Sequence, residues 1–354
     1  MAANDDGIIF DRCVQELELN GYALISLHTL ASCDDSSSSK TINSAFAIAR
    51  NALDNEEKHK SVPQIDPSSD SSCWTGYHSA AVVNGRYNQY REGFVFSNGD
   101  MFDVNMNQDN VGEELMFEKE MSNLFRIMHN DISNGVLRAI ERRLELPNLY
   151  FHQEFGPTDN ASQWHMKRYV VNFQQREMQN EGVPNNTSSE IFLPVHTDPS
   201  LISVVILDEI GTNEGGLGLE VHHPLKNTIT QQNRSSSTWK EISHYGHDVA
   251  IIFIGSVLSY LTKNQIFSAA KHRVVNWTTS NNDSDAQNAR MAATLFVRPH
   301  PDAFMTLPSP YIQINEVLKK SPPTFRVWNK RVAKNYQKSK SKQQNKKKSV
   351  LQSS

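Results

Sequence analysis

Two hydrophobic patterns divide the chain, and the first has the period of an α-helix. Between about Thr41 and Lys60, and again between about Glu113 and Leu144, apolar residues recur on one stripe, and Pro147 follows the second segment. The stripes contain Ile42, Ala45, Phe46, Ala49 and Leu53 in the first segment, and Met121, Leu124, Phe125, Met128, Ile132, Val136 and Ile140 in the second. We predict two amphipathic helices with buried apolar faces, the second of them packed against a sheet.

The second pattern consists of short apolar runs, and it dominates the chain beyond residue 190. Continuous runs at 201–207 and 248–255 are typical of fully buried strands, and Val274 and Val275 indicate a further strand. Gly215 and Gly216 mark a tight turn into another strand. This part of the chain is therefore predicted to be mainly β.

Candidate metal ligands lie at the edges of these strands. His196 and Asp198 precede one run, and His272 opens the strand that contains Val274. Residues two apart on an extended strand point to the same side, so the first two side chains can reach one ion. Two imidazoles and one carboxylate form the facial triad of non-haem Fe(II) sites. His-x-Asp alone is more often a surface pair, and the flanking strands are what favour a metal site.

Several ordered motifs between about Trp164 and Ala303 resemble the Fe(II)/2-oxoglutarate-dependent oxygenases of the isopenicillin N synthase-like superfamily. They are His196-Thr-Asp-Pro-Ser-Leu-Ile202, Gly216-Leu-Gly-Leu-Glu220, Ile254-Gly-Ser256, Ala269-Ala-Lys-His-Arg-Val274, and Arg290 followed by Phe296-Val-Arg-Pro-His-Pro-Asp302. Upstream, 20–25 resembles the first strand of that family, and 76–77 with 91–94 resembles its N-terminal segment. The resemblance implies a mainly β fold with flanking α: a double-stranded β-helix (jelly roll) core buttressed by N-terminal and C-terminal helices.

The same resemblance implies an organisation into four segments. Residues 1–150 would form an N-terminal α/β segment that packs on the core, and 151–310 the jelly-roll core. A C-terminal helix is expected within 311–337. Residues 338–354 carry lysines among Ser, Gln and Asn, a low-complexity composition that cannot bury a core, so we expect a disordered basic tail.

The resemblance also assigns roles to single residues. His196, Asp198 and His272 would bind Fe(II), and Arg290 would hold the distal carboxylate of 2-oxoglutarate with its planar guanidinium. Tyr169 is similar to a tyrosine beside the metal and is a further candidate for cosubstrate binding. For Tyr169 the alternative is a strand tyrosine packed with its hydroxyl in water.

The chain departs from the family pattern in three respects. Ala292 stands where the family has a serine whose hydroxyl also contacts the distal carboxylate. Loss of this hydrogen bond would cost about 1.5 to 3 kcal/mol of binding free energy, unless Thr294 on the same strand face replaces it. Asp198 and His272 are 272 − 198 = 74 positions apart, longer than usual, as is the separation of His272 from Arg290. We assign the excess to polar surface insertions at 227–238 and 278–288, which cost little closure entropy.

The activity implied is an Fe(II)- and 2-oxoglutarate-dependent dioxygenase that hydroxylates, desaturates or cyclises a small organic substrate. Its cofactors would be Fe(2+), 2-oxoglutarate and O2, and its products succinate and CO2. One alternative is an isopenicillin N synthase-like iron oxidase that does not use 2-oxoglutarate, which Ala292 favours. Another is a catalytically silent jelly-roll binding protein.

Composition limits the classes of partner and the cellular compartments that we expect for this protein. The chain has 354 residues and 38% hydrophobic content, enough for one sizeable core, and a net charge of −4 argues against a nucleic-acid-binding body. Three cysteines imply no disulfide framework and fit a reducing compartment. No leader pattern and no apolar run of about 18 residues is present. We expect a cytoplasmic monomer without membrane or nucleic-acid partners, although the basic tail leaves a nuclear location open.

Overall fold

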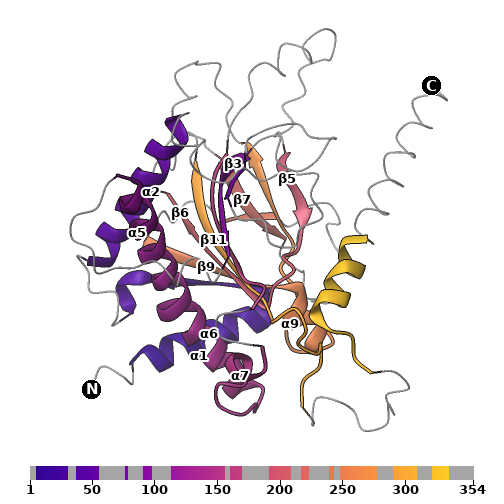
Figure 1. Cartoon of the computed structure of the whole chain (residues 1–354). Helices are drawn as coiled ribbons and strands as arrows, with labels where there is room; N and C mark the ends of the chain where they lie inside the picture. Colours follow the sequence, from indigo (N-terminus) through magenta and orange to yellow (C-terminus); the bar gives the residue numbers. More distant parts are fainter. Residues whose placement is uncertain are drawn as a thin grey trace, which may run out of the picture.

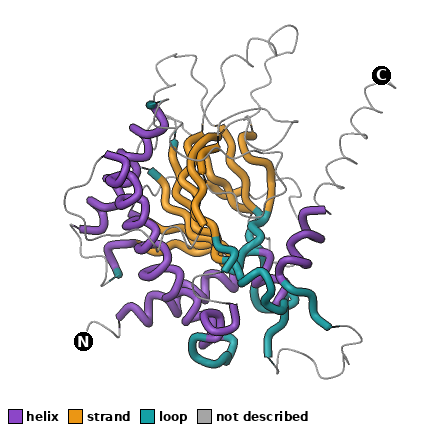
Figure 2. The backbone as a smooth tube through the Cα atoms, viewed as in Figure 1, coloured by secondary structure: helices purple, strands orange, loops and turns teal. Residues whose placement is uncertain are grey.

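The computed structural model shows two antiparallel sheets that face each other, with helices outside the larger one (Figure 1). The structure describes residues 5–30, 37–55, 76–78, 91–97, 113–155, 160–169, 191–208, 217–222, 239–242, 248–276, 290–308 and 321–334. Figure 2 shows the strands gathered in the centre and the helices at the periphery. The expected mainly β architecture with flanking helices is confirmed.

Every strand pairing in the two sheets is antiparallel. The seven-stranded sheet has the order β1 (Tyr22–Ser26), β9 (Val249–Ile254), β6 (Ile202–Leu207), β11 (Met291–Val297), β4 (Gln163–Tyr169), β3 (Arg91–Ser97) and β2 (Gly76–His78). The four-stranded sheet has the order β5 (Ile191–His196), β10 (His272–Asn276), β7 (Leu217–His222) and β8 (Trp239–Glu241). Sequential neighbours such as β5 and β6 lie in different sheets, so the chain crosses repeatedly between them.

The helices cover the outer face of the seven-stranded sheet (Figure 1). They are α1 (Asp5–Asn20), α2 (Ser37–Asp54), α5 (Glu113–Arg126), the π-helical η3 (Ile127–Ser133), α6 (Asn134–Arg143) and α7 (Tyr150–Phe155). Shorter elements are the 3-10 turn η2 (Leu27–Thr29) and α9 (Ser256–Leu261). Contacts of η3 with β6 and β11, and of α1 with β1 and β9, fix this layer on the sheet.

The second predicted helix is correct in its extent and its buried face. It runs as α5, η3 and α6, and its seven predicted core residues are all 0% exposed. The π-helical turn in its middle was not predicted; there the Ser133 hydroxyl donates to the carbonyl of Met128, 2.7 Å away. The first predicted helix is α2, which begins at 37 rather than 41, and residues 56–60 of the prediction lie outside the described residues.

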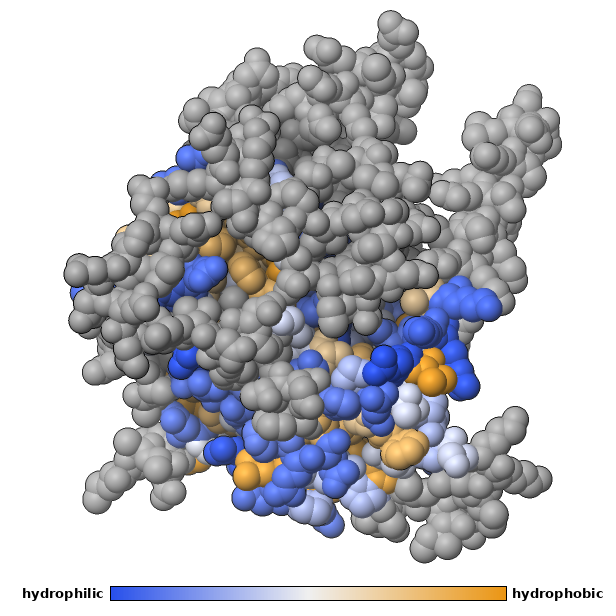
Figure 3. All heavy atoms as spheres, in the orientation of Figure 1, coloured by the Kyte–Doolittle hydropathy of each residue, from blue (hydrophilic) through white to orange (hydrophobic). Residues whose placement is uncertain are grey.

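The C-terminal helix occupies 325–334, within the predicted segment, and begins after Pro322 and Pro323. The predicted turn at Gly215 and Gly216, the insertions at 227–238 and 278–288, and the basic tail at 338–354 lie outside the described residues. In the part of the chain that the structure describes, no helix is long and apolar enough to cross a membrane. The face drawn in Figure 3 is mostly hydrophilic where it is described, with apolar side chains scattered over it.

Strand β4 illustrates how the sheet separates two environments. Trp164 and Met166 point into the apolar core shared with the helices. His165, Lys167 and Tyr169 alternate with them and line a cavity between the two sheets. This cavity contains the candidate metal ligands.

Candidate metal centre

The three predicted ligands come together at one end of the cavity between the sheets. His196 is the last residue of β5, and His272 is the first residue of β10 and lies directly opposite it in the antiparallel pair. Asp198 follows two positions after His196, in the connection to β6. Among the described residues, these three form the one cluster of His, Cys, Asp and Glu side chains with metal-ligating geometry.

One detail of the sequence argument was wrong: Asp198 is not on an extended strand with His196. The strand ends at His196, and Pro199, which has no N–H to donate to a neighbouring strand, follows Asp198. The turn into β6, rather than strand alternation, directs the carboxylate toward the imidazoles.

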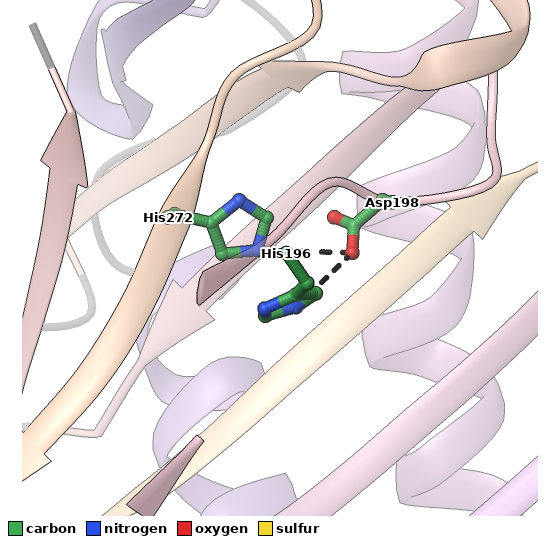
Figure 4. A group of neighbouring side chains, drawn as sticks. All are labelled: His196, Asp198 and His272. Carbon is green, nitrogen blue, oxygen red and sulfur yellow. Dashed lines mark ion pairs between the residues drawn. The ribbon is translucent and has the colours of Figure 1, made fainter. Parts of the chain in front are cut away.

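The ligand atoms of the triad converge on one point (Figure 4). One carboxylate oxygen of Asp198, Oδ1, lies 3.6 Å from Nε2 of His196 and 3.7 Å from Nε2 of His272. Neighbouring ligands of one divalent ion, each about 2.1 Å from it, would be separated by about 3 Å. A small inward movement of the side chains would therefore bring all three atoms within bonding distance of one ion.

Hydrogen bonds to backbone carbonyls fix which nitrogen of each imidazole faces the ion. Nδ1 of His196 lies 2.9 Å from the carbonyl oxygen of Pro194, and Nδ1 of His272 lies 3.1 Å from that of Ala270. A carbonyl can only accept, so Nδ1 carries the proton in each ring and donates it. Nε2 then has a free lone pair directed at the metal position, the arrangement usual in metal-binding histidines.

The site is buried, and burial keeps His196 in the neutral form that binds a cation. Asp198 is 4% and His272 5% exposed, and the His272 ring stacks on Phe253 with a centroid distance of 4.5 Å. Burial, with the nearby His272, lowers the pKa of His196 to about 4, so its imidazole is neutral at pH 7. Two neutral imidazoles and a carboxylate fit a divalent transition-metal ion such as Fe(II).

The loop that carries Asp198 is held by the start of α9. The backbone N–H and the hydroxyl of Ser256 both donate to the carbonyl oxygen of Asp198, at 2.7 and 2.9 Å. At Gly255 an added Cβ would lie 1.9 Å from the carbonyl oxygen of Ser200, so only glycine permits this approach. The motif Ile254-Gly-Ser256 thus has a positioning role that its sequence did not reveal.

Arg290 and Tyr169 line the same cavity at a distance along the strands from the triad. Arg290 directly precedes β11 and is 5% exposed, and its carbonyl accepts the backbone N–H of Tyr169 at 2.9 Å. Burial lowers the pKa of Arg290 to about 10, which leaves the guanidinium charged at neutral pH. Ala292 and Thr294 line the cavity as well, so their predicted position on the face of Arg290 is confirmed.

Three further polar residues line the cavity and were missed in the sequence. They are Arg91 on β3 and His165 and Lys167 on β4. Once Tyr169 is placed on a strand that faces the cavity, strict alternation puts His165 and Lys167 on the same face, so the signal was present. Arg91 could not be found this way, because its pairing with Tyr169 joins distant segments.

Comparison with known proteins establishes the fold. No family model and no curated protein matches the chain. Solved structures do match along most of its length, and they include dioxygenases for auxin oxidation, one of them in complex with 2-oxoglutarate, so the predicted jelly roll is confirmed.

Three of these structures show the extent of the likeness. A full-length Neurospora crassa protein in complex with alpha-KG and thymine has a TM-score of 0.63 and 13% identity, over 92% of this chain and 91% of that one. JOX2 in complex with 2OG, Fe and JA has a TM-score of 0.62 and 15% identity, over 92% and 82%. The rice dioxygenase for auxin oxidation has a TM-score of 0.59 and 16% identity, over 92% and 90%.

Proposed function

We propose that this protein is an Fe(II)- and 2-oxoglutarate-dependent dioxygenase that oxidises a small organic substrate, with release of succinate and CO2. The convergence of His196, Asp198 and His272 on one point inside a cavity carries the proposal. The fold supports it, since solved proteins of the same fold include complexes with alpha-KG, 2OG and Fe. Hydroxylation, desaturation and cyclisation are all open to such a site.

In this proposal the triad binds iron on one side and leaves the other coordination positions to 2-oxoglutarate and O2. Bound iron and 2-oxoglutarate supply the oxidising chemistry, and the protein supplies binding, orientation and a dry environment. Arg290 holds the far carboxylate of 2-oxoglutarate through paired, charge-assisted hydrogen bonds, and Tyr169 beside it adds a hydroxyl.

Apolar side chains from both sheets line the rest of the cavity. They are Leu193, Val205, Leu207, Leu219, Phe253 and Val274. A water-poor cavity strengthens the electrostatic contacts of Arg290 and limits side reactions of the oxidant.

The second candidate is an iron oxidase that uses the same triad without 2-oxoglutarate. Ala292 favours it, because the side chain at this cavity position has no hydroxyl for a distal carboxylate. A binding protein that keeps the ligands without turnover would also contain the triad. Both alternatives are outcomes of the experiment below.

The neighbours do not indicate which substrate this chain takes. The Neurospora crassa protein is seen with thymine, JOX2 with JA, and the rice protein is a dioxygenase for auxin oxidation, so one fold accepts dissimilar small molecules. We further propose that the protein is a cytoplasmic monomer without nucleic-acid partners. The net charge of −4 and the buried, free Cys13 support this proposal, and the basic tail leaves a nuclear location open. The division into segments 1–150, 151–310, 311–337 and 338–354 stays a prediction.

The direct test of turnover is succinate release in air from protein loaded with Fe(II) and supplied with 2-oxoglutarate. It is measured alone and with thymine, an auxin or JA, and His196→Ala is the matched control. The proposal predicts succinate that requires iron and oxygen and disappears in the control. Oxygen uptake without succinate would favour the oxidase, and 2-oxoglutarate binding without oxygen uptake would favour the binding protein.

A further inference from the structure

A buried lysine lies in the middle of the cavity wall, between the metal ligands and Arg290. Lys167 is 5% exposed and pairs with Ala292 on β11 and with Gly93 on β3. Its neighbour along the cavity face is His165, which pairs with Thr294. Both side chains therefore lie on the inner face of the seven-stranded sheet, directly beside β11, the strand that follows Arg290.

The contacts of Lys167 do not account for a buried ammonium group. Its Nζ donates to the carbonyl oxygen of Gly93 at 3.5 Å, the long limit for such a bond. Within the described ranges, no carboxylate lies within ion-pair distance of it. A buried charge without a partner is costly, so a group like this is either neutral or completed by a ligand.

The backbone beside Lys167 is shaped for close approach. Gly93 has φ +142°, and an added Cβ would lie 2.0 Å from the carbonyl oxygen of Met166. Only glycine allows β3 to approach β4 this closely, and the approach gives Nζ its one acceptor among the described residues.

His165 supplies a second donor on the same face. Its Nε2 is buried and has no hydrogen-bond partner among the described residues, and its ring meets the edge of Phe296 at a centroid distance of 4.8 Å. Residues two apart on a strand are about 7 Å apart, a span that the long lysine side chain can close to reach a common ligand.

The acidic residues near this wall are already paired with other cations. Glu92 is on the opposite face of β3 and binds Arg168 and the hydroxyl of Tyr77. Asp208 forms an ion pair with Arg50, and Glu220 with Arg273 at 2.5 Å. Among the residues that the structure describes, none of these carboxylates is therefore available as a counter-ion to Lys167.

The proposed metal centre offers none either. With neutral imidazoles, the charges of Asp198, Fe(II), 2-oxoglutarate and Arg290 cancel. The positive charge of Arg91, and that which Lys167 can carry, are therefore in excess of what iron and cosubstrate need. The remaining ligand of such an enzyme is the molecule it oxidises.

We propose that Lys167, assisted by His165, binds a carboxylate group of the substrate, so that the enzyme acts on small organic acids. This inference rests on the proposed function. Burial and the positive charge of Arg91 lower the pKa of Lys167 well below its usual value, and Glu92 opposes them. A carboxylate at Nζ would restore the ammonium form, so binding would couple to proton uptake.

The test compares carboxylates with uncharged amides of the same shape. Acetate, butyrate, benzoate and phenylacetate, and the four corresponding primary amides, are added to protein loaded anaerobically with Fe(II) and 2-oxoglutarate. Binding is followed by the shift of Tm and by perturbation of the Fe(II) and 2-oxoglutarate absorption band. Lys167→Met and His165→Phe are the variants, and Lys334→Met, the same change at an exposed position, is the control.

We expect at least one carboxylate to raise Tm where its amide does not. Lys167→Met should weaken that binding at least tenfold and His165→Phe several-fold, and Lys334→Met should not change it. Equal binding of acids and amides, or no carboxylate-dependent shift in wild type, would overturn the proposal. So would a loss of affinity in Lys167→Met that falls on 2-oxoglutarate instead, since Lys167 would then be a cosubstrate ligand.

The two proposals can fail separately. Absence of the absorption band in wild type would contradict the dioxygenase function, whereas the carboxylate-dependent shift of Tm can still be scored in metal-free protein. The proposal stays testable if Lys167→Met does not fold, because His165→Phe can still be measured.

Discussion

The two faces of the seven-stranded sheet use the same strands for different purposes. The face toward the helices is mainly apolar, from Trp164 and Met166 on β4 to Ala293 and Leu295 on β11, and its charged residues Arg168 and Glu92 bind each other. The face toward the four-stranded sheet places Lys167 and the neighbouring Arg290 in the cavity, opposite the two histidines of the triad and among a smaller apolar cluster. Apolar burial on the helix side stabilises the fold. This stabilising free energy offsets the cost of burying charged groups on the cavity side.

Substitutions on the two faces of β4 should have different effects on stability, with the larger loss on the helix side. Trp164→Ala removes a fully buried side chain, so we expect a loss of about 3–5 kcal/mol in the free energy of unfolding. Lys167→Met, three residues later on the other face, should change it by less than about 1 kcal/mol, because a poorly paired buried amine is replaced by an apolar chain. Urea unfolding of both variants tests this, and similar losses would show that the two faces are not separate in function.

Loss of a metal ligand should reduce iron binding and leave the fold intact. His272→Ala removes one of three ligands, and we expect iron affinity to fall by more than about 100-fold with the fold retained. Iron content after gel filtration, with circular dichroism as the control for folding, measures both properties. Stoichiometric iron in this variant would refute the triad.

Arg290 should affect the cosubstrate and leave the metal unchanged. Arg290→Ala removes the charge-assisted contacts, so 2-oxoglutarate should bind about 10- to 100-fold more weakly, while iron binding stays at the wild-type level. Arg290→Lys keeps the charge and loses the paired geometry, so it should recover part of the affinity. Unchanged affinity for 2-oxoglutarate in Arg290→Ala would remove this residue from the site.

The smallest effect concerns pH. Burial, assisted by Lys167 and Arg91, lowers the pKa of His78 on β2 to about 3. The folded pKa is below the unfolded value of about 6.5, so this contribution to stability is complete above pH 6.5 and is lost as pH falls toward 3. In metal-free protein, urea unfolding at pH 7.0 and 5.5 should show lower stability at pH 5.5, and His78→Gln should reduce that loss by about 1 kcal/mol. A pH dependence unchanged by His78→Gln would contradict the assignment.

The helix side of this comparison could be predicted from local sequence, and the cavity side only in part. The seven residues that a 3.6-residue stripe identified in the second helix are all buried, because periodicity depends on the helix alone. The π-helical turn at 127–133 does not interrupt that stripe, so the hydrophobic pattern could not reveal it. The triad was found because its ligands lie in recognisable motifs at strand ends.

The missing part depends on pairing between distant strands. Lys167 becomes a cavity residue through its position opposite Ala292 and Gly93, which lie more than 70 residues away on either side. No local pattern encodes that pairing. The placement of Asp198 beyond the end of β5 likewise depends on where the chain leaves one sheet for the other.

The central claim, that this cavity holds iron and 2-oxoglutarate together, is tested most directly by an anaerobic titration. Protein loaded with Fe(II) is titrated with 2-oxoglutarate while the weak visible charge-transfer absorption of a chelated 2-oxo acid is recorded. We expect a saturable band that His196→Ala abolishes and Arg290→Ala shifts to higher 2-oxoglutarate concentration. Iron bound at one equivalent with no band at saturating 2-oxoglutarate would contradict this claim.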